Sequence, residues 1–208
     1  MRSATGESGA TMDFLDNRRL KRQFEFIIEL DRVKSIFRKS RLFDGSRYEN
    51  DAEHSWTICV MALVLKEYSN IDIDVEKVLK MLLLHDVVEI DAGDTFLYSR
   101  ERAAAHDREA EAAERIFGLL PEDQRDEFKS LWYEFEERAT SESKFASVLD
   151  RLEPLLQNFV NSGSTWKENG VEHEMVVERN NHIAEGSRRL WEVAKKLIDE
   201  ALERGFFA

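Results

Sequence analysis

The sequence predicts an all-α, single-domain helical bundle, and three observations support this fold class. Apolar residues recur at helical spacing along nearly the whole chain. Only nine glycines and two prolines interrupt 208 residues, of which 42% are hydrophobic, so disordered, collagen-like and many-turned β-sandwich classes are excluded. No alternation of strands and helices follows the apolar segments, which argues against an α/β fold. The length suits one ordinary domain with a core.

The sequence of the first half of the chain indicates a tail followed by three helices. Residues 1–11 are polar and small and predict a disordered tail, so the domain is expected to span 12–208. The expected elements are a helix at 13–33, a loop at 32–47, a helix at 51–68 with Asp51 as its N-cap, and a helix that Asp74 caps and that runs through Ile90.

The second half predicts four more helices and one loop. These are a charged helix at 101–117, a helix with Pro121 in its first turn, a helix at 142–161, a loop at 162–170 and a long last helix from Val176 to Leu202. The apolar stripe of the last helix has near-heptad spacing, so it packs either on its own bundle or on a second subunit.

Charge is distributed unevenly along the chain. The net charge is -12, which argues against a nucleic acid polymer as the main partner. Residues 32–47, however, hold six basic residues against the single acid Asp44, a local charge of +5. Such a segment is either a solvated loop or a small anion-binding site. The lone Cys59 and the absence of an apolar stretch of roughly 18 to 20 residues favour a reducing, cytoplasmic compartment and no membrane association.

A His-Asp pair interrupts the most apolar segment of the chain, residues 81–90. Burying a carboxylate costs several kcal/mol unless it is compensated, and a metal ion is the strongest compensation. The pair His85-Asp86 therefore indicates either a metal site or a core histidine bonded to a neighbouring carboxylate.

Two further candidates lie on other predicted helices. His54 stands at the end of a core-facing stripe, and Asp150 lies inside the apolar surface of the 142–161 helix. Alone, each has an ordinary structural interpretation, as a core histidine and as a surface acid paired with Arg151 or Lys144. Together with His85-Asp86 they supply two imidazoles and two carboxylates from three helices, as in helix-bundle metal sites.

This arrangement resembles the HD superfamily of metal-dependent phosphohydrolases. The segments 47–55 (RYENDAEHS) and 85–89 (HDVVE), followed by Gly93-Asp94, are similar to motifs of the branch that contains bacterial 5'-deoxyribonucleotidases. The resemblance implies that His54, His85, Asp86 and Asp150 bind one divalent ion. Two nitrogen and two oxygen donors suit Mn, Co, Ni or Fe(II), whereas Mg prefers more oxygen.

Glu89 and Asp94 are the predicted catalytic residues. On a helix, Glu89 stands four residues from His85 and three from Asp86, so it reaches the same face as both. This placement suits a general acid/base, or equally an acceptor that holds a ligand histidine in its tautomer. Asp94 resembles the family's second functional acid, although the position also suits an N-cap.

The resemblance also gives the basic segment a role. In the similar branch, the loop before the first motif contacts the nucleotide, which places Arg38 and Lys39 at the phosphate, with Arg41 and Arg47 as further candidates. An aromatic residue is expected beside the arginine, whereas this chain has Lys39, so no sugar preference is implied.

The sequence thus predicts a phosphohydrolase that removes the 5'-phosphate from (deoxy)nucleoside monophosphates. The alternatives are an HD hydrolase of nucleoside triphosphates or cyclic nucleotides, for which His106 is the only further metal ligand, and a non-catalytic nucleotide-binding protein. The resemblance also implies a homodimer. Pro154, four residues after Asp150, predicts a bend that aims Asp150 at the metal, although a simple packing role is equally consistent with its position.

Overall fold

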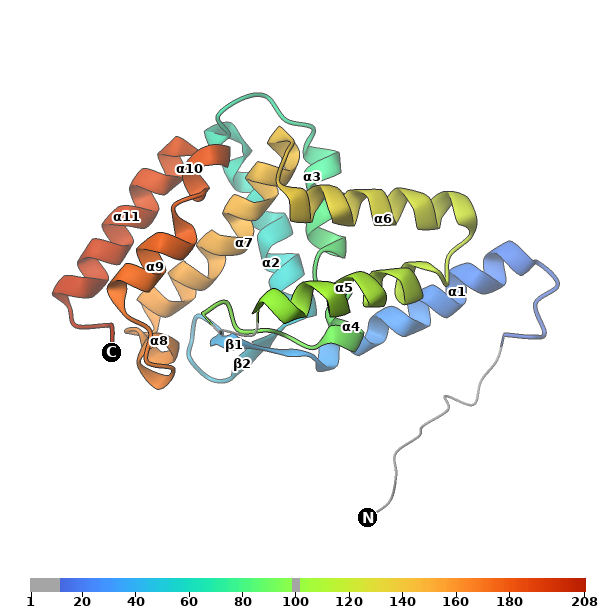
Figure 1. The fold of residues 1–208 in the computed structure, drawn as a ribbon, viewed down its shortest axis with the longest axis horizontal. Coiled ribbons are helices and arrows are strands. Elements are labelled where there is room, and N and C mark those ends of the chain that lie inside the picture. The colour runs from blue at the N-terminus through green and yellow to red at the C-terminus, as the bar shows by residue number, and fades with distance from the viewer. Residues whose placement is uncertain (1–11, 99–101) are drawn as a thin grey trace, which may run out of the picture.

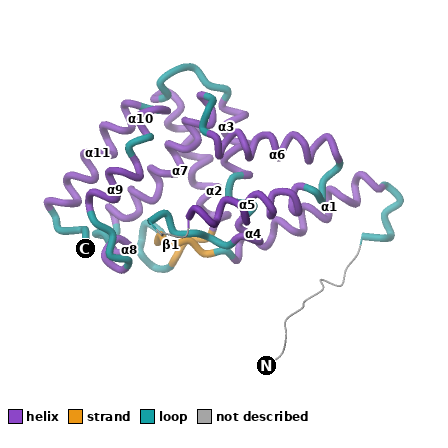
Figure 2. Tube along the Cα trace, viewed as in Figure 1, coloured by secondary structure: helices purple, strands orange, loops and turns teal. Residues whose placement is uncertain are grey.

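Helices make up almost all of the regular structure (Figures 1 and 2). The computed structural model describes residues 12–98 and 102–208, so the predicted tail at 1–11 lies outside it. The helices are α1 (Arg18–Leu30), α2 (Asp51–Leu65), α3 (Val75–Leu84), α4 (Glu89–Ala92), α5 (Arg102–Phe117), α6 (Glu122–Glu137), α7 (Ser141–Val160), α8 (Ser164–Glu168), α9 (His173–Asn180), α10 (Ile183–Gly186) and α11 (Arg188–Glu203), with 3-10 turns at Asp31–Ser35 and Lys66–Tyr68. Two short strands, β1 (Phe37–Arg41) and β2 (Tyr48–Asn50), pair antiparallel. The predicted all-α class is confirmed.

Helix α7 runs through the middle of the bundle (Figure 1) and contacts α2, α3, α6, α10 and α11. It begins in a capping box, in which the Thr140 hydroxyl accepts a hydrogen bond from the Ser143 amide. Its side chains Phe145, Val148 and Leu149 are fully buried. The helix matches the predicted 142–161 element and carries Asp150 into the centre of the molecule.

The first two helices begin at side-chain caps. Helix α1 starts at Arg18 because the Asn17 side chain accepts from the Leu20 amide, so the predicted start at residue 13 is wrong. Asn50, and not Asp51, caps α2, and it exchanges capping-box bonds with Glu53. The prediction of Asp51 as the N-cap is therefore wrong, and its side chain is free for another role.

The basic segment forms a hairpin, so the predicted loop at 32–47 is wrong in part. Gly45 takes a positive φ of 71°, and the Asp44 carboxylate accepts from the Ser46 amide, which reverses the chain. The flanking residues then pair as β1 and β2, and β1 packs on α7 and α8. The hairpin thus places one edge of the basic segment against the bundle core.

The predicted long last helix is divided into α9, α10 and α11. Ser187 has an extended backbone and caps α11 by accepting from the Leu190 amide. Gly186 lies against α7 so closely that a Cβ would come within 2.6 Å of the Lys144 carbonyl oxygen. The apolar stripe of α11 (Leu190, Ala194, Ile198) is buried within its own bundle.

Two smaller predictions also need correction. The predicted loop at 162–170 contains the short helix α8, and Pro121 is the N-cap of α6 instead of a first-turn residue. Asp74 caps α3 as predicted, because its carboxylate accepts from the Glu76 and Lys77 amides. Among the described residues, we find no helix with the length and apolarity needed to span a bilayer.

Candidate metal centre and active site

His54 lies in the first turns of α2 and is fully buried against α7. Its Nε2 atom is 3.2 Å from Asp150 Oδ1, and its Nδ1 atom is 3.3 Å from Glu153 Oε2. Burial lowers the pKa of His54, but the hydrogen bonds with Asp150 and Glu153 outweigh this effect and raise it. Both ring nitrogens therefore face carboxylates, although a neutral imidazole has one proton to donate.

His85 and Asp86 lie where α3 ends, so the predicted continuous helix through Ile90 is wrong. The chain turns tightly after Leu84, with hydrogen bonds from the Val87 amide to the Leu84 carbonyl and from the Glu89 amide to the Asp86 carbonyl. The indole of Trp132 donates to the His85 carbonyl at 3.1 Å. Adjacent residues of a continuous helix point about 100° apart. The break lets two neighbouring side chains face one point.

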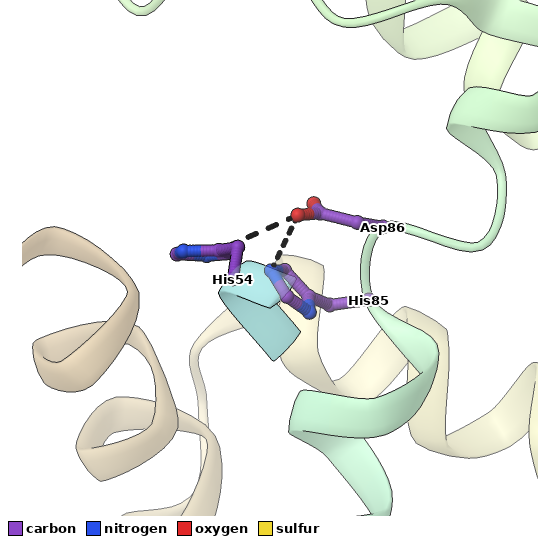
Figure 3. Close-up of side chains that lie close together, drawn as sticks. All are labelled: His54, His85 and Asp86. Atoms are coloured by element: carbon purple, nitrogen blue, oxygen red, sulfur yellow. Dashed lines mark ion pairs between the residues drawn. The ribbon is translucent and has the colours of Figure 1, made fainter. Parts of the chain in front are cut away.

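The break brings three of the four predicted ligands together (Figure 3). The Asp86 Oδ2 atom is 3.0 Å from His85 Nε2 and 3.9 Å from His54 Nε2. Asp150 closes the group, with Oδ1 lying 3.7 Å from His85 Nε2. The structure thus brings all four predicted ligands together from α2, the turn after α3, and α7.

The hydrogen bonding of His85 fits a cation at this point. Its Nδ1 atom lies 2.9 Å from the Leu82 carbonyl and donates to it, while Nε2 is buried and makes no hydrogen bond within the described residues. Burial lowers the pKa of His85, but the charges of Asp86 and Asp150 raise it to about 10. A pKa this high means that in the metal-free protein Nε2 carries a proton beside the two carboxylates, where a divalent ion could supply the positive charge instead. The mixed nitrogen and oxygen donors suit Mn, Fe, Co or Ni.

Arg38 reaches this group from β1. Its Nη1 atom is 2.6 Å from Asp86 Oδ2 and 3.4 Å from Asp51 Oδ1, and its side chain is only 13% exposed. Burial raises the pKa of Asp86, but the charges of His85 and Arg38 outweigh it and hold the pKa below its usual range. Arg38 thus places a guanidinium, a group suited to binding phosphate, beside the four predicted ligands.

Glu89 and Asp94 form a second carboxylate group with Asp51. Each offers an oxygen within 4.8 Å of the other two. Burial and the charges of Asp86 and Asp51 hold the pKa of Glu89 well above its usual range, and burial with the charge of Asp86 raises the pKa of Asp51 to about 7. An oxygen-only group of this kind suits a hard divalent ion or bound protons.

Two cavities meet at the site and share three acidic residues. Asp86, Glu89 and Asp150 line both of them. The first cavity also has polar and aromatic walls that include Arg38, Lys39, Phe96, Tyr98, Asn158, Trp166 and Asn180. The second cavity extends towards His106, Arg138 and Arg179. The first cavity thus places aromatic faces beside the Arg38 guanidinium.

Of the other residues predicted to contact phosphate, one lies at the first cavity and two lie elsewhere. Lys39 lines the first cavity. Arg47 lies outside both cavities, where its guanidinium binds the Glu53 carboxylate at 2.5 and 2.7 Å. Arg41 stacks on Tyr48 and pairs with Glu168. The structure therefore brings Arg38 and Lys39 to the site but not Arg41 or Arg47.

Comparison with known proteins decides the family. The sequence model of the HD domain family matches residues 30–191, which is most of the chain. The chain belongs to the HD domain family. A protein from Magnetospirillum magnetotacticum MS-1, described as a predicted metal-dependent phosphohydrolase, has a solved structure that superposes with a TM-score of 0.88 at 49% identity, over 91% of this chain and 96% of that one.

Two proteins named 5'-deoxynucleotidases and a more distant phosphohydrolase are also similar to this chain. The human 5'-deoxynucleotidase HDDC2 is 35% identical over 135 residues, which are 64% of this chain and 65%, just under two thirds, of the human protein. The bovine 5'-deoxynucleotidase HDDC2 is 30% identical over 72% of this chain and 73% of its own length. An HD-domain phosphohydrolase from Listeria innocua, 16% identical with a TM-score of 0.56, shares the fold.

Asp51 and Glu153 also lie against the side chains of this site, and the sequence prediction of the site did not include them. Asp51 stands three residues before His54 on α2, and Glu153 three residues after Asp150 on α7. In both cases the i, i+3 spacing puts the acid on the same helix face as a predicted ligand. That spacing is the signal that could have identified both residues.

Replacing Pro154 with alanine tests whether the proline aims Asp150. Alanine restores an amide that can bond to the Asp150 carbonyl, so we expect a more stable α7 but roughly 10-fold weaker metal retention, the size typical of a disturbed outer contact. Metal content after dialysis measures retention, and Val160→Ala on the exposed end of α7 is the control. Unchanged metal content in Pro154→Ala would leave the proline with a packing role only.

Proposed function

We propose that this HD protein is a divalent-metal-dependent phosphohydrolase that removes the 5'-phosphate from (deoxy)nucleoside monophosphates. The single observation that carries the proposal is the convergence of two histidines and two aspartates beside the guanidinium of Arg38, 2.6 Å from Asp86 Oδ2. Relatives named 5'-deoxynucleotidases support the substrate class. The proposed catalytic unit is the domain predicted at 12–208, and the lone Cys59 supports a cytoplasmic location.

Each residue of the site has a separate role in the proposed hydrolysis. A divalent ion held by the two histidines, Asp86 and Asp150 would polarise the phosphoryl group and acidify the attacking water. Glu89, whose burial beside the charges of Asp86 and Asp51 raises its pKa and so its basicity, would accept a proton from the attacking water as the new P–O bond forms and the bond from phosphorus to the 5'-oxygen breaks. Arg38 donates hydrogen bonds to the non-bridging phosphoryl oxygens and offsets their developing charge. Asp94 lines the same cavity, and burial raises its pKa, so it can hold a proton of its own and donate it to the leaving 5'-oxygen.

The nucleoside would occupy the first cavity. Phe96, Tyr98 and Trp166 provide aromatic faces there, and Asn158 and Asn180 provide amides. Aromatic faces bind any base by stacking, whereas the amides can select among bases. A monophosphate places its phosphorus at the carboxylates while its base reaches these walls.

A phosphate-release screen tests the proposal against its alternatives. Metal-stripped protein is reconstituted with Mn, Co, Ni, Fe(II) or Mg and assayed with ribo- and deoxyribonucleoside monophosphates, triphosphates and cyclic nucleotides. We expect release from 5'-monophosphates. A preference for triphosphates or cyclic nucleotides would favour the other hydrolase class, and tight nucleotide binding without release would favour a non-catalytic binding protein.

We also propose that the protein is a homodimer joined through the outer face of α2. Trp56, Val60, Leu63 and Val64 lie on one face of this helix and are exposed, and no charged residue follows Glu53 in α2. A two-fold axis would bring this apolar face against the same face of a second copy and so bury both. The buried stripe of α11 is not available for this contact.

Replacing Trp56, which is 68% exposed, with glutamate should convert the dimer into a monomer. Two symmetry-related charges would enter an apolar interface, so association should weaken by at least about 30-fold, the equivalent of ~2 kcal/mol. Sedimentation velocity measures the oligomeric state, and Leu202→Glu on the exposed side of α11 is the control. A monomeric wild type, or a Trp56→Glu dimer as stable as wild type, would exclude this interface.

A further inference from the structure

A group of buried polar side chains lies behind His54. Glu49, Glu153 and Gln157 are 2%, 0% and 1% exposed. None of the three is among the described residues that line either cavity, so they have no access to a substrate there. Burying carboxylates costs several kcal/mol each unless they are compensated. Their position therefore needs a physical explanation other than substrate binding.

Helix α7 places two carboxylates against the two nitrogens of one ring. Asp150 and Glu153 stand three residues apart, and so lie one above the other on the same helix face. Asp150 Oδ1 is 3.2 Å from His54 Nε2, and Glu153 Oε2 is 3.3 Å from His54 Nδ1. The ring lies between them, with one carboxylate on the metal side and one on the buried side.

We infer that Glu153 is a positioning residue for the metal centre: it accepts the Nδ1 proton of His54 and so leaves the Nε2 lone pair directed at the metal. A neutral imidazole has one proton, and the acceptor at one nitrogen decides which nitrogen is free to bind a metal. A carboxylate in this position also increases the basicity of the ring. The inference rests on the proposed role of His54 as a ligand.

The second histidine of the centre provides an internal comparison. His85 directs its Nδ1 proton to the Leu82 backbone carbonyl at 2.9 Å, which achieves the same tautomer with a neutral acceptor. Only the acceptor of His54 is a side chain. Mutation can therefore remove the support of one ligand and leave that of the other intact.

Glu49 adds a second carboxylate from β2. Its Oε2 atom is 3.7 Å from His54 Nδ1, and oxygens of Glu49 and Glu153 lie within 4.8 Å of each other and of the ring nitrogen. The longer distance makes Glu153 the direct acceptor. The same three groups have the spacing of a metal site of their own, so an experiment must separate support of His54 from direct binding of an ion.

Glu153→Gln is the test, read out by metal affinity in the absence of substrate. Competition with a chromophoric chelator should show that the variant binds Co²⁺ or Mn²⁺ about 10 to 100 times more weakly than wild type, which is the usual effect of losing such a partner. Glu153→Leu should lose more metal affinity than Glu153→Gln, because leucine has no acceptor for the Nδ1 proton, whereas the glutamine amide oxygen can still accept it. Turnover by Glu153→Gln should recover at saturating metal.

The stability of the metal-free protein separates positioning from a purely structural role. Glu153→Gln neutralises one of two adjacent buried carboxylates, so the melting temperature of the metal-free variant should not fall, whereas the rise on adding metal should shrink. Glu192→Gln on the exposed surface of α11 makes the same charge change and should leave every readout at the wild-type value.

Two results would overturn the inference. Wild-type metal affinity in both Glu153 variants would show that the carboxylate does not support His54. A loss of one bound ion per chain, with the affinity of the remaining ion unchanged, would make Glu153 a ligand instead of a positioning residue. Because both readouts need no substrate, they stand whether or not the protein proves to be a 5'-nucleotidase.

Discussion

Replacing Asp86 with alanine is expected to abolish metal binding and phosphate release together. The Asp86 carboxylate is the point where the centre converges, 3.0 Å from His85 Nε2, 3.9 Å from His54 Nε2 and 2.6 Å from the Arg38 guanidinium. Losing an outer partner of a metal ligand typically costs about 10–100-fold, so losing a direct ligand should cost more than about 100-fold in affinity and turnover. Metal analysis and phosphate release on the same sample measure both effects.

Asp91→Ala is the matched control for this variant. Asp91 lies five residues further along the same segment, where it pairs with Arg115 on the surface, and it lines neither cavity within the described residues. It should retain its metal and its turnover. Full activity in Asp86→Ala would refute the assignment of the centre.

Replacing Arg38 with alanine should separate catalysis from metal binding. The guanidinium contacts ligand carboxylates in the metal-free protein, so its loss should leave metal affinity equal to or tighter than wild type. Without its donors to the phosphoryl oxygens, kcat/KM should fall by about 10²- to 10³-fold, the usual effect of removing one preorganised donor. Steady-state kinetics at saturating metal and metal titration measure the two effects.

Arg38→Ala also leaves buried acids without their cation. In the metal-free protein this should lower the free energy of unfolding by about 3 to 5 kcal/mol, and added metal should restore most of it. Arg38→Lys should keep the stability better than the turnover, since lysine lacks the fork that binds phosphate. Lys34→Ala, at an exposed position before β1, is the charge-matched control. Weaker metal binding in Arg38→Ala would show that the arginine supports the ligands instead of the substrate.

The sequence predicted four side chains that the structure brings together, but not the backbone that aligns them. Apolar residues surround the His-Asp pair on both sides, which is why a continuous helix was expected through Ile90. The helix in fact ends at Leu84, and the hydrogen bond from the Trp132 indole to the His85 carbonyl belongs to that ending. Trp132 is 47 residues away in sequence, so local periodicity carries no information about it.

The basic segment shows a second limit of the same kind. Its composition was consistent with either a solvated loop or an anion site, and the structure places Arg38 at the carboxylates. The hairpin that puts it there depends on pairing across the turn at Gly45 and on packing against α7, so the segment was expected to be a loop. Arg47 shares the composition but binds Glu53 on the surface. The local excess of basic residues therefore identified the segment, but only the tertiary contacts determine that Arg38, and not Arg47, lies at the carboxylates.

The most direct test of the proposed function is phosphate release from a deoxynucleoside 5'-monophosphate by metal-stripped protein before and after reconstitution. We expect no release without metal, release that rises with Mn²⁺ or Co²⁺ and saturates at a fixed number of ions per chain, and no release from the corresponding 3'-monophosphate. Equal release with and without metal, or none from any 5'-monophosphate with every ion tested, would contradict the assignment.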